Sequence, residues 1–370
     1  MSSTAADPVL VTGAFGQAGS RCTAILLSRG RTVIAMDLRN DKTVEKAGEL
    51  AASAGPGTLV PAYVNLMDAD ALAALVAEHR PEAIVHLAAV LAPVSYRNPK
   101  LARQVNVGGT RNLVAAACTL PTPPLFVYAS SAAVYGSRNP RRYPERLTAD
   151  TELNPIDHYG EEKVQAERII RDSGLPCAML RLGGVISPDG MAGAGTDHLV
   201  LMRAIPGDNR MHTVDGRDVA MAFANAVDRR EAIDGKVLLI AGNATHERTH
   251  RELEDDMMAA VGLGRLGPKA SLPGDPDDDG GWGPTGWFDT SESQALLDFQ
   301  HHDWQDTVSS VAEGMGWRRN ALRVAGPVLR PLLLLALHAQ RRMEKRGPYS
   351  DPWALIGEKY GADALAPTNA

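Results

Sequence analysis

The sequence has few of the features that mark secreted, metal-binding or membrane-spanning proteins. It contains only three cysteines, Cys22, Cys118 and Cys177, whose spacing matches no metal or redox motif, so we expect small buried hydrophobic residues in a reducing compartment. Residues 1–7 contain no basic segment followed by an apolar one, which predicts no secretory signal and a cytoplasmic location. No run of about 18 apolar residues occurs, which argues against a spanning helix.

Aromatic residues and net positive charge are also scarce. Aromatic residues make up 5% of the chain and the formal net charge is −6. A basic surface interleaved with aromatic side chains, which is typical of nucleic-acid binding, is therefore absent, and we expect no nucleic-acid partner. The 370 residues leave room for a large α/β domain, a smaller subdomain and an extension.

A glycine-rich turn near the N-terminus is the most informative stretch. Gly13, Gly16 and Gly19 lie between an apolar run (residues 8–11) and a helical pattern (residues 18–28). In a dinucleotide-binding turn, the first glycine permits the tight turn, the second lets the backbone approach a pyrophosphate, and the third allows close packing of the helix. The helix N-terminus then faces the phosphates. The predicted cofactor-binding residues of this turn are Gly13, Phe15, Gly16, Gln17, Ala18 and Gly19.

The end of the second apolar run indicates which dinucleotide binds. Residues 32–36 are apolar and end at Asp37, about 20 positions past the glycines, where a carboxylate can bind the adenosine ribose hydroxyls. Asp37 would repel a 2′-phosphate, so NAD is favoured, with Leu38 as a further contact. Arg39 could instead accommodate that phosphate, which leaves NADP as the less favoured alternative.

The pattern after Asp37 alternates between helices and strands. Expected helices cover 43–54 and 69–79, and expected strands cover 58–64 and 83–88. This alternation predicts a Rossmann-type, doubly wound parallel sheet with helices on both faces and ligands at the carboxyl ends of the strands. The strand-end residues that we expect to contact the cofactor are Asn65, Leu66, Leu87, Ala88 and Ala89, although packing alone could also explain them.

Two further motifs follow the glycine turn in a characteristic order. The segment Ser130-Ser131-x-x-Val134-Tyr135-Gly136 follows the fifth expected strand, and Tyr159-x-x-x-Lys163 with Glu167 opens a later helix. Together with the glycine turn, these motifs resemble the extended short-chain dehydrogenase/reductase family, also called the NAD-dependent epimerase/dehydratase family. The resemblance covers roughly residues 8–315.

The chemistry of Tyr159 depends on its surroundings. A spacing of four places Tyr159 and Lys163 on one helix face, so the ammonium, together with an oxidised nicotinamide, can lower the pKa of the phenol, ordinarily about 10, and make it a usable acid/base. The resemblance implies that Lys163 also holds the nicotinamide ribose and that Ser131, with Ser130 as the alternative, donates a hydrogen bond to the substrate oxygen. It further implies that Asn106 supports a water near the lysine; stabilisation of a helix irregularity is the other interpretation.

The substrate is less well defined. Sugar-nucleotide enzymes of this family place an asparagine where this chain has Gly184, and neither Arg210 nor Arg217 is in register with their arginine. The main hypothesis is therefore an NAD-dependent oxidoreductase that interconverts a secondary alcohol and a ketone on a largely apolar small molecule, with Tyr159 as acid/base. The alternative is a sugar-nucleotide epimerase or dehydratase with transient hydride transfer to bound NAD. A regulatory protein with a degenerate site is a third hypothesis.

Substrate contacts are expected from residues 91–96, residues 186–199 and the region after residue 265. Candidate pocket walls are Met191, Met202, Trp282 and Trp287, although ordinary packing is the more common role for each of them.

Three apparent metal motifs do not support a metal site. His246-Glu247-x-x-His250 matches a zinc protease string, but it follows an expected strand (residues 236–241) through a turn, so one helix does not hold it. Residues 275–280 imitate a calcium loop, but position 12 would be Gly286 instead of glutamate. His301-His302 is expected on the surface. We expect no metal.

The chain is expected to divide into three parts. Residues 1–182 form the NAD-binding domain, residues 183–316 mostly form a substrate-binding subdomain, with 215–242 returning to the Rossmann core, and residues 317–370 form a helical tail. Residues 317–346 contain eight arginines and lysines and one acid, and Pro327 and Pro331 are expected to break or start helices there. This tail could dock on its own domain, lie on a membrane surface, cover the pocket or contact a second subunit. The family resemblance implies a homodimer through the helices that carry Asn106 and Tyr159.

Overall fold

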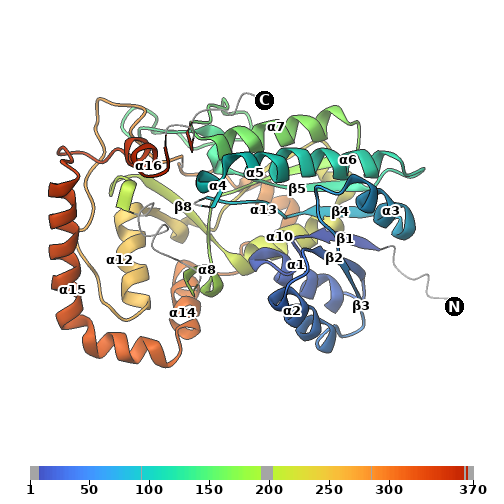
Figure 1. Cartoon of the computed structure of the whole chain (residues 1–370), viewed down its shortest axis with the longest axis horizontal. Helices are drawn as coiled ribbons and strands as arrows, with labels where there is room; N and C mark the ends of the chain where they lie inside the picture. The colour runs from blue at the N-terminus through green and yellow to red at the C-terminus, as the bar shows by residue number, and fades with distance from the viewer. Residues whose placement is uncertain (1–7, 93, 193–202, 285, 362–363, 366–370) are drawn as a thin grey trace.

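The computed structural model describes residues 8–92, 94–192, 203–284, 286–361 and 364–365. Its centre is a seven-stranded parallel sheet with the order β3-β2-β1-β4-β5-β6-β9. Helices cover both faces of this sheet (Figure 1). The predicted doubly wound α/β fold is confirmed.

The strands of the large sheet are short and mostly buried, because helices lie on both of its faces. β1 is buried at all four positions, and its residues Val9 and Leu10 pair with Val33 and Ile34. The seven strands are β1 (Val9–Thr12), β2 (Thr32–Asp37), β3 (Thr58–Tyr63), β4 (Ala83–His86), β5 (Leu125–Ser131), β6 (Cys177–Leu182) and β9 (Val237–Ile240).

Two helical layers pack on opposite faces of the sheet. One layer contains α1 (Gln17–Ser28), α2 (Asp41–Ala52), α10 (Gly216–Val227) and α13 (Ser291–Leu297). The other contains α3 (Ala69–His79), α6 (Thr110–Cys118) and α7 (His158–Asp172). Figure 1 shows α6 and α7 above the strands and α1, α2 and α10 below them. The short α11 (Arg230–Ile233) leads into β9.

Three helical segments follow one another directly over residues 99–118. α5 (Pro99–Arg103) is followed by a π-helical segment, η1 (Gln104–Gly109), and then by α6. A π-helical turn is rare and often marks a functional site. It contains Asn106, one of the predicted catalytic residues.

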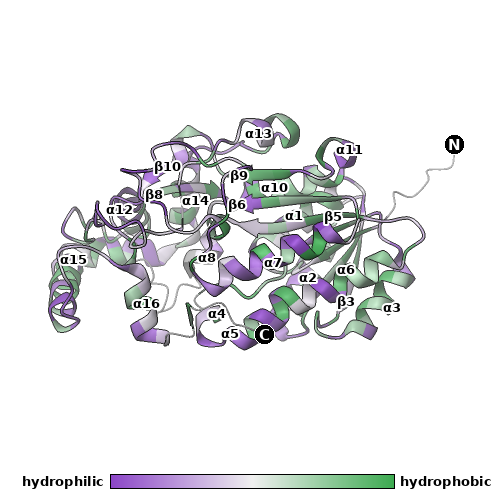
Figure 2. Ribbon diagram, turned by 90° about the horizontal axis from the view of Figure 1, so that it is seen from above, coloured by the Kyte–Doolittle hydropathy of each residue, from purple (hydrophilic) through white to green (hydrophobic). Residues whose placement is uncertain are grey.

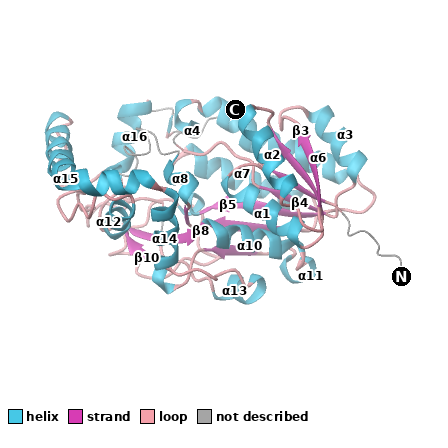
Figure 3. Cartoon of the chain, turned by 90° about the horizontal axis from the view of Figure 1, so that it is seen from below, coloured by secondary structure: helices cyan, strands magenta, loops and turns pink. Residues whose placement is uncertain are grey.

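A smaller sheet lies beyond the carboxyl ends of the large sheet. Its strand order is β10-β8-β7, formed by β7 (Gly184–Ile186), β8 (Arg210–Asp215) and β10 (Glu247–Thr249). The helices α8 (Pro188–Ala192), α12 (His250–Ala260) and α14 (Trp304–Gly314) lie with it. Figure 3 shows α12, α14, β8 and β10 at the end of the molecule away from the N-terminus. Between β8 and β10 the chain returns to the large sheet as α10 and β9.

The helical tail differs from its sequence expectation. α15 (Trp317–Met343) is one helix that contains both Pro327 and Pro331, whereas we expected these prolines to interrupt it. Proline inside a helix removes a hydrogen bond and bends the axis, and Figure 1 shows α15 bending along the edge of the molecule. Because the helix continues through the prolines, its length and composition are sufficient to cross a membrane, contrary to the expectation from the sequence. α16 (Pro352–Tyr360) follows it.

The cysteine expectation holds for two of the three residues. Cys22 and Cys177 are buried, but Cys118 at the end of α6 is exposed. All three thiols are free.

A buried histidine joins the first strand to the helix after the π-helical segment. His86 at the end of β4 is hydrogen-bonded through Nδ1 to Thr12 Oγ1 (2.7 Å) and through Nε2 to Thr110 Oγ1 (3.0 Å). Burial, together with the charge of Lys163, lowers the pKa of His86 to about 3. The imidazole therefore stays neutral in the folded protein at any pH near neutrality.

His86 is expected to make the fold sensitive to acid. Below its ordinary pKa of 6.5, the unfolded chain binds a proton that the folded chain does not, so the free energy of unfolding falls as pH falls. This loss is about 1.4 kcal/mol per pH unit for one such histidine. In urea titrations between pH 6.5 and pH 4, His86→Gln should show a shallower decline than the wild type. The exposed His301→Gln should decline like the wild type; equal slopes for all three proteins would contradict this assignment.

Candidate active site

The glycine turn connects β1 to α1 and packs against the end of β4. Gly13 has φ +65°, and a Cβ added there would lie 3.0 Å from Cα and N of Ala88. A Cβ at Gly19 would lie 2.0 Å from the Gly13 carbonyl oxygen. The first and third glycines are therefore required by the fold itself. A Cβ at Gly16 would meet only the Gly13 carbonyl oxygen, at 3.3 Å, so this position is open.

Asp37 lies directly across the turn. Its Oδ2 accepts a hydrogen bond from the backbone N–H of Phe15 (3.2 Å), and its Oδ1 accepts one from Leu38 N–H (2.8 Å). The Leu38 side chain is exposed. Arg39 stacks on the Tyr63 ring at 5.0 Å from its centroid. The carboxylate is thus placed next to the turn, while the arginine has an aromatic partner.

The other predicted cofactor residues line the same edge of the sheet. Ala88 N–H donates to Thr12 Oγ1 (3.2 Å), and Leu87, Ala88 and Ala89 are half-buried. Asn65 is exposed, and Leu66 is buried against Gly109 of the π-helical segment. These two segments follow β3 and β4, which lie on opposite sides of β1 in the order β3-β2-β1-β4, so they flank the turn.

The start of α1 is tied to the smaller sheet. Gln17 Oε1 accepts a hydrogen bond from Ser187 Oγ (2.9 Å), and Arg21 forms an ion pair with Asp189 (2.7 Å). Ala18 is half-buried and packs against the core. The side chain of Gln17 therefore links the glycine turn of the large sheet to the segment that follows β7 of the smaller sheet.

Ser131, Tyr159 and Lys163 come together at the end of β5 and the start of α7. A side-chain hydrogen bond links Ser131 with Tyr159. Lys163 Nζ donates to the Ala129 carbonyl oxygen (2.6 Å) and lies 5.7 Å from the centre of the Tyr159 ring. Ser130, the alternative to Ser131, instead donates to Glu167 Oε1 (2.6 Å) and is buried.

The electrostatics of this cluster differ from the expectation based on spacing. Burial raises the pKa of Tyr159 above its ordinary value, and the hydrogen bond with Ser131 opposes that rise. Burial lowers the pKa of Lys163 to about 8, although Glu162 and Glu167 oppose the change. In the protein alone the ammonium does not lower the phenol pKa, because burial of the phenol outweighs it; the joint effect of Lys163 and an oxidised nicotinamide stays a prediction.

Asn106 connects α7 to the loop after β4. Its Oδ1 accepts from Val90 N–H (2.8 Å), and its Nδ2 donates to the Val90 carbonyl oxygen (3.0 Å) and to Glu162 Oε2 (2.7 Å). Burial raises the pKa of Glu162, and the hydrogen bond from Asn106 opposes that rise. Asn106 thus holds the loop that carries Leu87, Ala88 and Ala89, a role that sequence reasoning did not identify.

The tail packs beside Tyr159, which the sequence did not predict. Asp157 caps α7 by accepting from Gly160 N–H (2.8 Å), and its other oxygen accepts from Tyr96 Oη (2.5 Å). The Tyr96 ring packs on Tyr360 of α16, and the next residue along from Asp157, His158, is hydrogen-bonded to the Ala364 carbonyl oxygen. Tyr96, which we expected to touch the substrate, is instead buried as a support for α7. An Asp-x-x-Gly helix cap was the available sequence signal.

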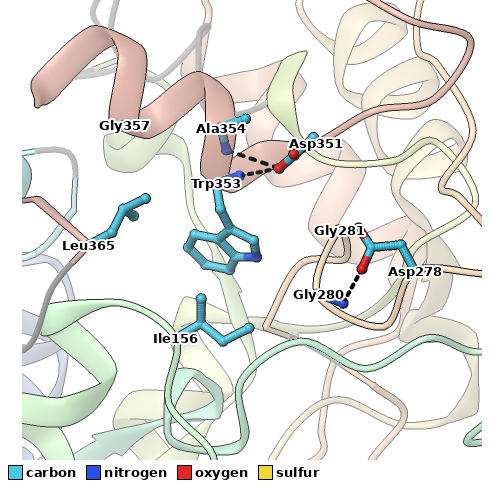
Figure 4. Close-up of a pocket in the computed structure, with 9 residues that line it drawn as sticks. All are labelled: Ile156, Asp278, Gly280, Gly281, Asp351, Trp353, Ala354, Gly357 and Leu365. Carbon is cyan, nitrogen blue, oxygen red and sulfur yellow. Dashed lines mark hydrogen bonds between the residues drawn. The ribbon is translucent and has the colours of Figure 1, made fainter. Parts of the chain in front are cut away.

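The two tryptophans expected as pocket walls do not line the cavity beside Ile156. Trp282 is fully buried and Trp287 stacks with Arg210, so the structure gives each a packing role. Met202 and residues 193–199 lie outside the described residues, as do the side-chain surroundings of Met191. A cavity of about 510 Å³ does lie between Ile156 and the tail, and Figure 4 shows Trp353 and Leu365 around it.

The rejected metal motifs have structural roles. His246 ends a short 3₁₀ helix, η3 (Ala244–His246), Glu247 lies in β10, and His250 begins α12, so one helix does not hold both histidines. Among the described residues, no cluster of three or more metal-ligating side chains occurs. The expectation that His302 is a surface residue is wrong, because its Nδ1 pairs with the buried Asp218 at 2.5 Å.

The contact between Tyr96 and Asp157 can be tested by stability. Tyr96→Phe removes the hydroxyl and leaves one oxygen of the buried Asp157 without this donor, so the free energy of unfolding should fall by about 1–3 kcal/mol in urea titrations. Tyr349→Phe removes the same hydroxyl at a side chain that is 40% exposed and should change little. Equal effects of the two variants would show that the contact contributes nothing.

Comparison with known proteins places this geometry in a family. A sequence model of the NAD dependent epimerase/dehydratase family matches residues 9–241. Similar curated proteins include UDP-glucose 4-epimerase of Lactobacillus helveticus, 30% identical over 57% of this chain and 63% of that protein. Methionine adenosyltransferase 2 subunit beta of Rattus norvegicus is 32% identical over 32% of this chain and 34% of that protein. The chain spans less than two thirds of each of these relatives.

Solved structures share the fold at lower identity. UDP-glucose-4-epimerase from Stenotrophomonas maltophila, with bound NAD and formylated UDP-arabinopyranose, has a TM-score of 0.67 at 21% identity, covering 86% of this chain and 100% of that chain. The UDP-Glc/GlcNAc 4-epimerase from Campylobacter jejuni has a TM-score of 0.66 at 18% identity, covering 85% and 99%. The family model, the shared fold and the cluster of Ser131, Tyr159 and Lys163 agree: the chain belongs to the NAD dependent epimerase/dehydratase family.

Proposed function

We propose that this protein binds NAD and catalyses hydride transfer at a carbinol carbon, with Tyr159 as the acid/base. The observation that carries this proposal is the position of the hydrogen-bonded pair Ser131 and Tyr159 beside Lys163. Ser131 ends β5, and Tyr159 and Lys163 lie in α7 beside it. β5 is two strands away from β1, which leads into the glycine turn, and both strands are parallel. Parallel strands bring their carboxyl ends to one edge, where ligands of such sheets bind.

The turn fits an NAD molecule. Gly16 leaves open space where a pyrophosphate needs close approach to the backbone, and the N-terminus of α1 follows it directly. Asp37 supplies a carboxylate for ribose hydroxyls and disfavours the 2′-phosphate of NADP. Because Arg39 stacks on Tyr63, the observed arrangement supports NAD over NADP. When bound, NAD supplies the hydride acceptor and, when oxidised, a positive charge in the site.

Side chains of the protein transfer the proton. In the oxidation direction, the substrate hydroxyl gives its proton to the Tyr159 phenolate while its carbon gives up a hydride; in the reverse direction, Tyr159 returns the proton to the oxygen. Ser131, which is already within hydrogen-bonding reach of Tyr159, donates to the same substrate oxygen. Burial keeps Tyr159 protonated in the protein alone, so its action as a base requires positive charge nearby. Lys163 is the residue available to supply part of it.

We propose a sugar nucleotide as the substrate, converted by epimerisation or dehydration. The support is that similar proteins and structures are named as UDP-glucose 4-epimerases. A second candidate, oxidation of a largely apolar alcohol, has a specific observation in its favour. Arg210 donates to the Pro144 carbonyl oxygen (2.8 Å), and Arg217 pairs with Asp215 (2.8 Å), so both arginines considered as diphosphate ligands have protein partners.

We further propose a homodimer in the cytoplasm. The helices that carry Asn106 and Tyr159 pack side by side on one face of the sheet, where a second copy could extend the layer, and Leu101 of α5 is 37% exposed there. Three free cysteines are typical of a reducing compartment.

Nicotinamide absorbance tests the proposed reaction. Purified protein is supplied with NAD or NADP and with UDP- and dTDP-sugars, beside aryl, terpenoid and steroid alcohols. We expect sugar conversion without net reduction of free NAD, and a loss of turnover of about 100-fold or more in Tyr159→Phe. Tyr349→Phe should retain full activity.

Two other outcomes would overturn parts of the proposal. Net reduction of NAD by an apolar alcohol, lost in Tyr159→Phe, would replace the sugar-nucleotide proposal with the second candidate. A biological role that survives Tyr159→Phe unchanged would indicate a regulatory protein.

A further inference from the structure

α15 exposes an unusual amount of apolar surface. Seven of the sixteen large hydrophobic side chains that are exposed in the described part of the chain belong to this one helix. We call five of them the apolar ridge: Val324, Val328, Leu329, Leu332 and Leu335. Val324 is 83% and Leu335 is 65% exposed, although a helix of a soluble domain ordinarily turns such residues inward. Docking of the whole helix on its own domain therefore does not occur, and Gly326 is its only buried residue among those described.

Positive charge surrounds the apolar ridge. Residues 317–346 hold eight arginines and lysines and one acid, whereas the whole chain has a net charge of −6. Five of these cations are exposed: Arg318, Arg323, Arg330, Arg342 and Lys345. Figure 2 shows α15 at the edge of the molecule with hydrophobic and hydrophilic residues side by side. This composition matches helices that lie in the headgroup region of a bilayer.

Both ends of α15 are fastened to the same body of the protein. Near its start, Arg319 Nε donates to the Ala260 carbonyl oxygen (3.0 Å). Near its end, Arg341 Nη1 donates to the Lys269 carbonyl oxygen (2.9 Å), and the adjoining Glu344 pairs with Arg203 (3.0 Å). A helix held at both ends by one globular body cannot place its ends on opposite sides of a bilayer. α15 can therefore meet a membrane only by lying along its surface.

We propose that the apolar ridge of α15 docks on the surface of an anionic lipid bilayer. The ridge enters the boundary between headgroups and acyl chains, and the surrounding cations lie among the lipid phosphates. Charge complementarity selects this occupant over a second copy of the chain, since pairing two ridges would bring two cationic helices together. The proposal is independent of the proposed function.

The docking orients the active site as well as anchoring the protein. α16 continues from α15 and packs on Tyr96, whose hydroxyl supports Asp157 at the start of α7. The membrane-facing helix is thus linked, through α16 and then Tyr96, to the helix that carries Tyr159.

Vesicle flotation with the full-length protein tests this proposal. We expect the protein to float with vesicles of phosphatidylcholine and phosphatidylglycerol and to stay behind with phosphatidylcholine alone. Leu335→Glu should weaken binding by about tenfold or more. The substitution removes a leucine that would be buried in the bilayer and adds a negative charge that the anionic lipids repel. Arg330→Gln should weaken it by about fivefold, and high salt should weaken it for every protein.

Two exposed residues away from α15 provide matched controls. Val44→Glu on α2 and Arg229→Gln before α11 make the same chemical changes and should leave flotation unchanged. Equal binding to both vesicle types, or equal effects of Leu335→Glu and Val44→Glu, would overturn the proposal. Sedimentation equilibrium tests whether a second copy of the chain binds the apolar ridge instead. If the wild type is a dimer that does not float, and Leu335→Glu is a monomer, the apolar ridge is a subunit interface and the proposal is wrong.

Discussion

The structure depends on close backbone packing within the glycine turn. The Gly13 carbonyl oxygen occupies the space that a side chain at Gly19 would need, and Gly13 itself lies against the backbone of Ala88. This packing joins β1, α1 and the end of β4 without any intervening side chain. The N-terminus of α1 therefore points at a surface made of backbone, beside the carboxylate of Asp37. Such a surface suits a pyrophosphate and an attached ribose.

Burial explains the rest of the site. Tyr159 and Lys163 are held in low-dielectric surroundings, where burial raises the pKa of the phenol and lowers the pKa of the ammonium. Both shifts favour neutral groups, so the pair becomes a proton carrier only when positive charge enters the site. Asn106 and the contact of Tyr96 with Asp157 fasten this helix to the cofactor loop and to the tail. Positioning is thus shared among segments that are distant in the chain.

The sequence predicted the parts of the molecule that follow local rules. The glycine spacing, the alternation of strands and helices, and the four-residue spacing of Tyr159 and Lys163 each have a direct structural consequence, and the structure contains all three. It did not predict the buried contacts between distant segments, such as Tyr96 with Asp157 or His302 with Asp218, because nothing local encodes them. The prediction for the tail was wrong because it relied on a local rule. Proline ordinarily ends or breaks a helix, but α15 continues through Pro327 and Pro331 with a bend.

Calorimetric titration of NAD into the wild type and Gly16→Val tests the central claim most directly. A Cβ at Gly16 meets only one backbone atom, at 3.3 Å, and valine is a poorer helix N-cap than glycine, so the variant should fold with only a small fall in melting temperature. Its side chain would nevertheless occupy the place where a pyrophosphate must approach the backbone. We therefore predict that the wild type binds NAD and that Gly16→Val binds at least about tenfold more weakly. Equal affinity of the two folded proteins would contradict the account.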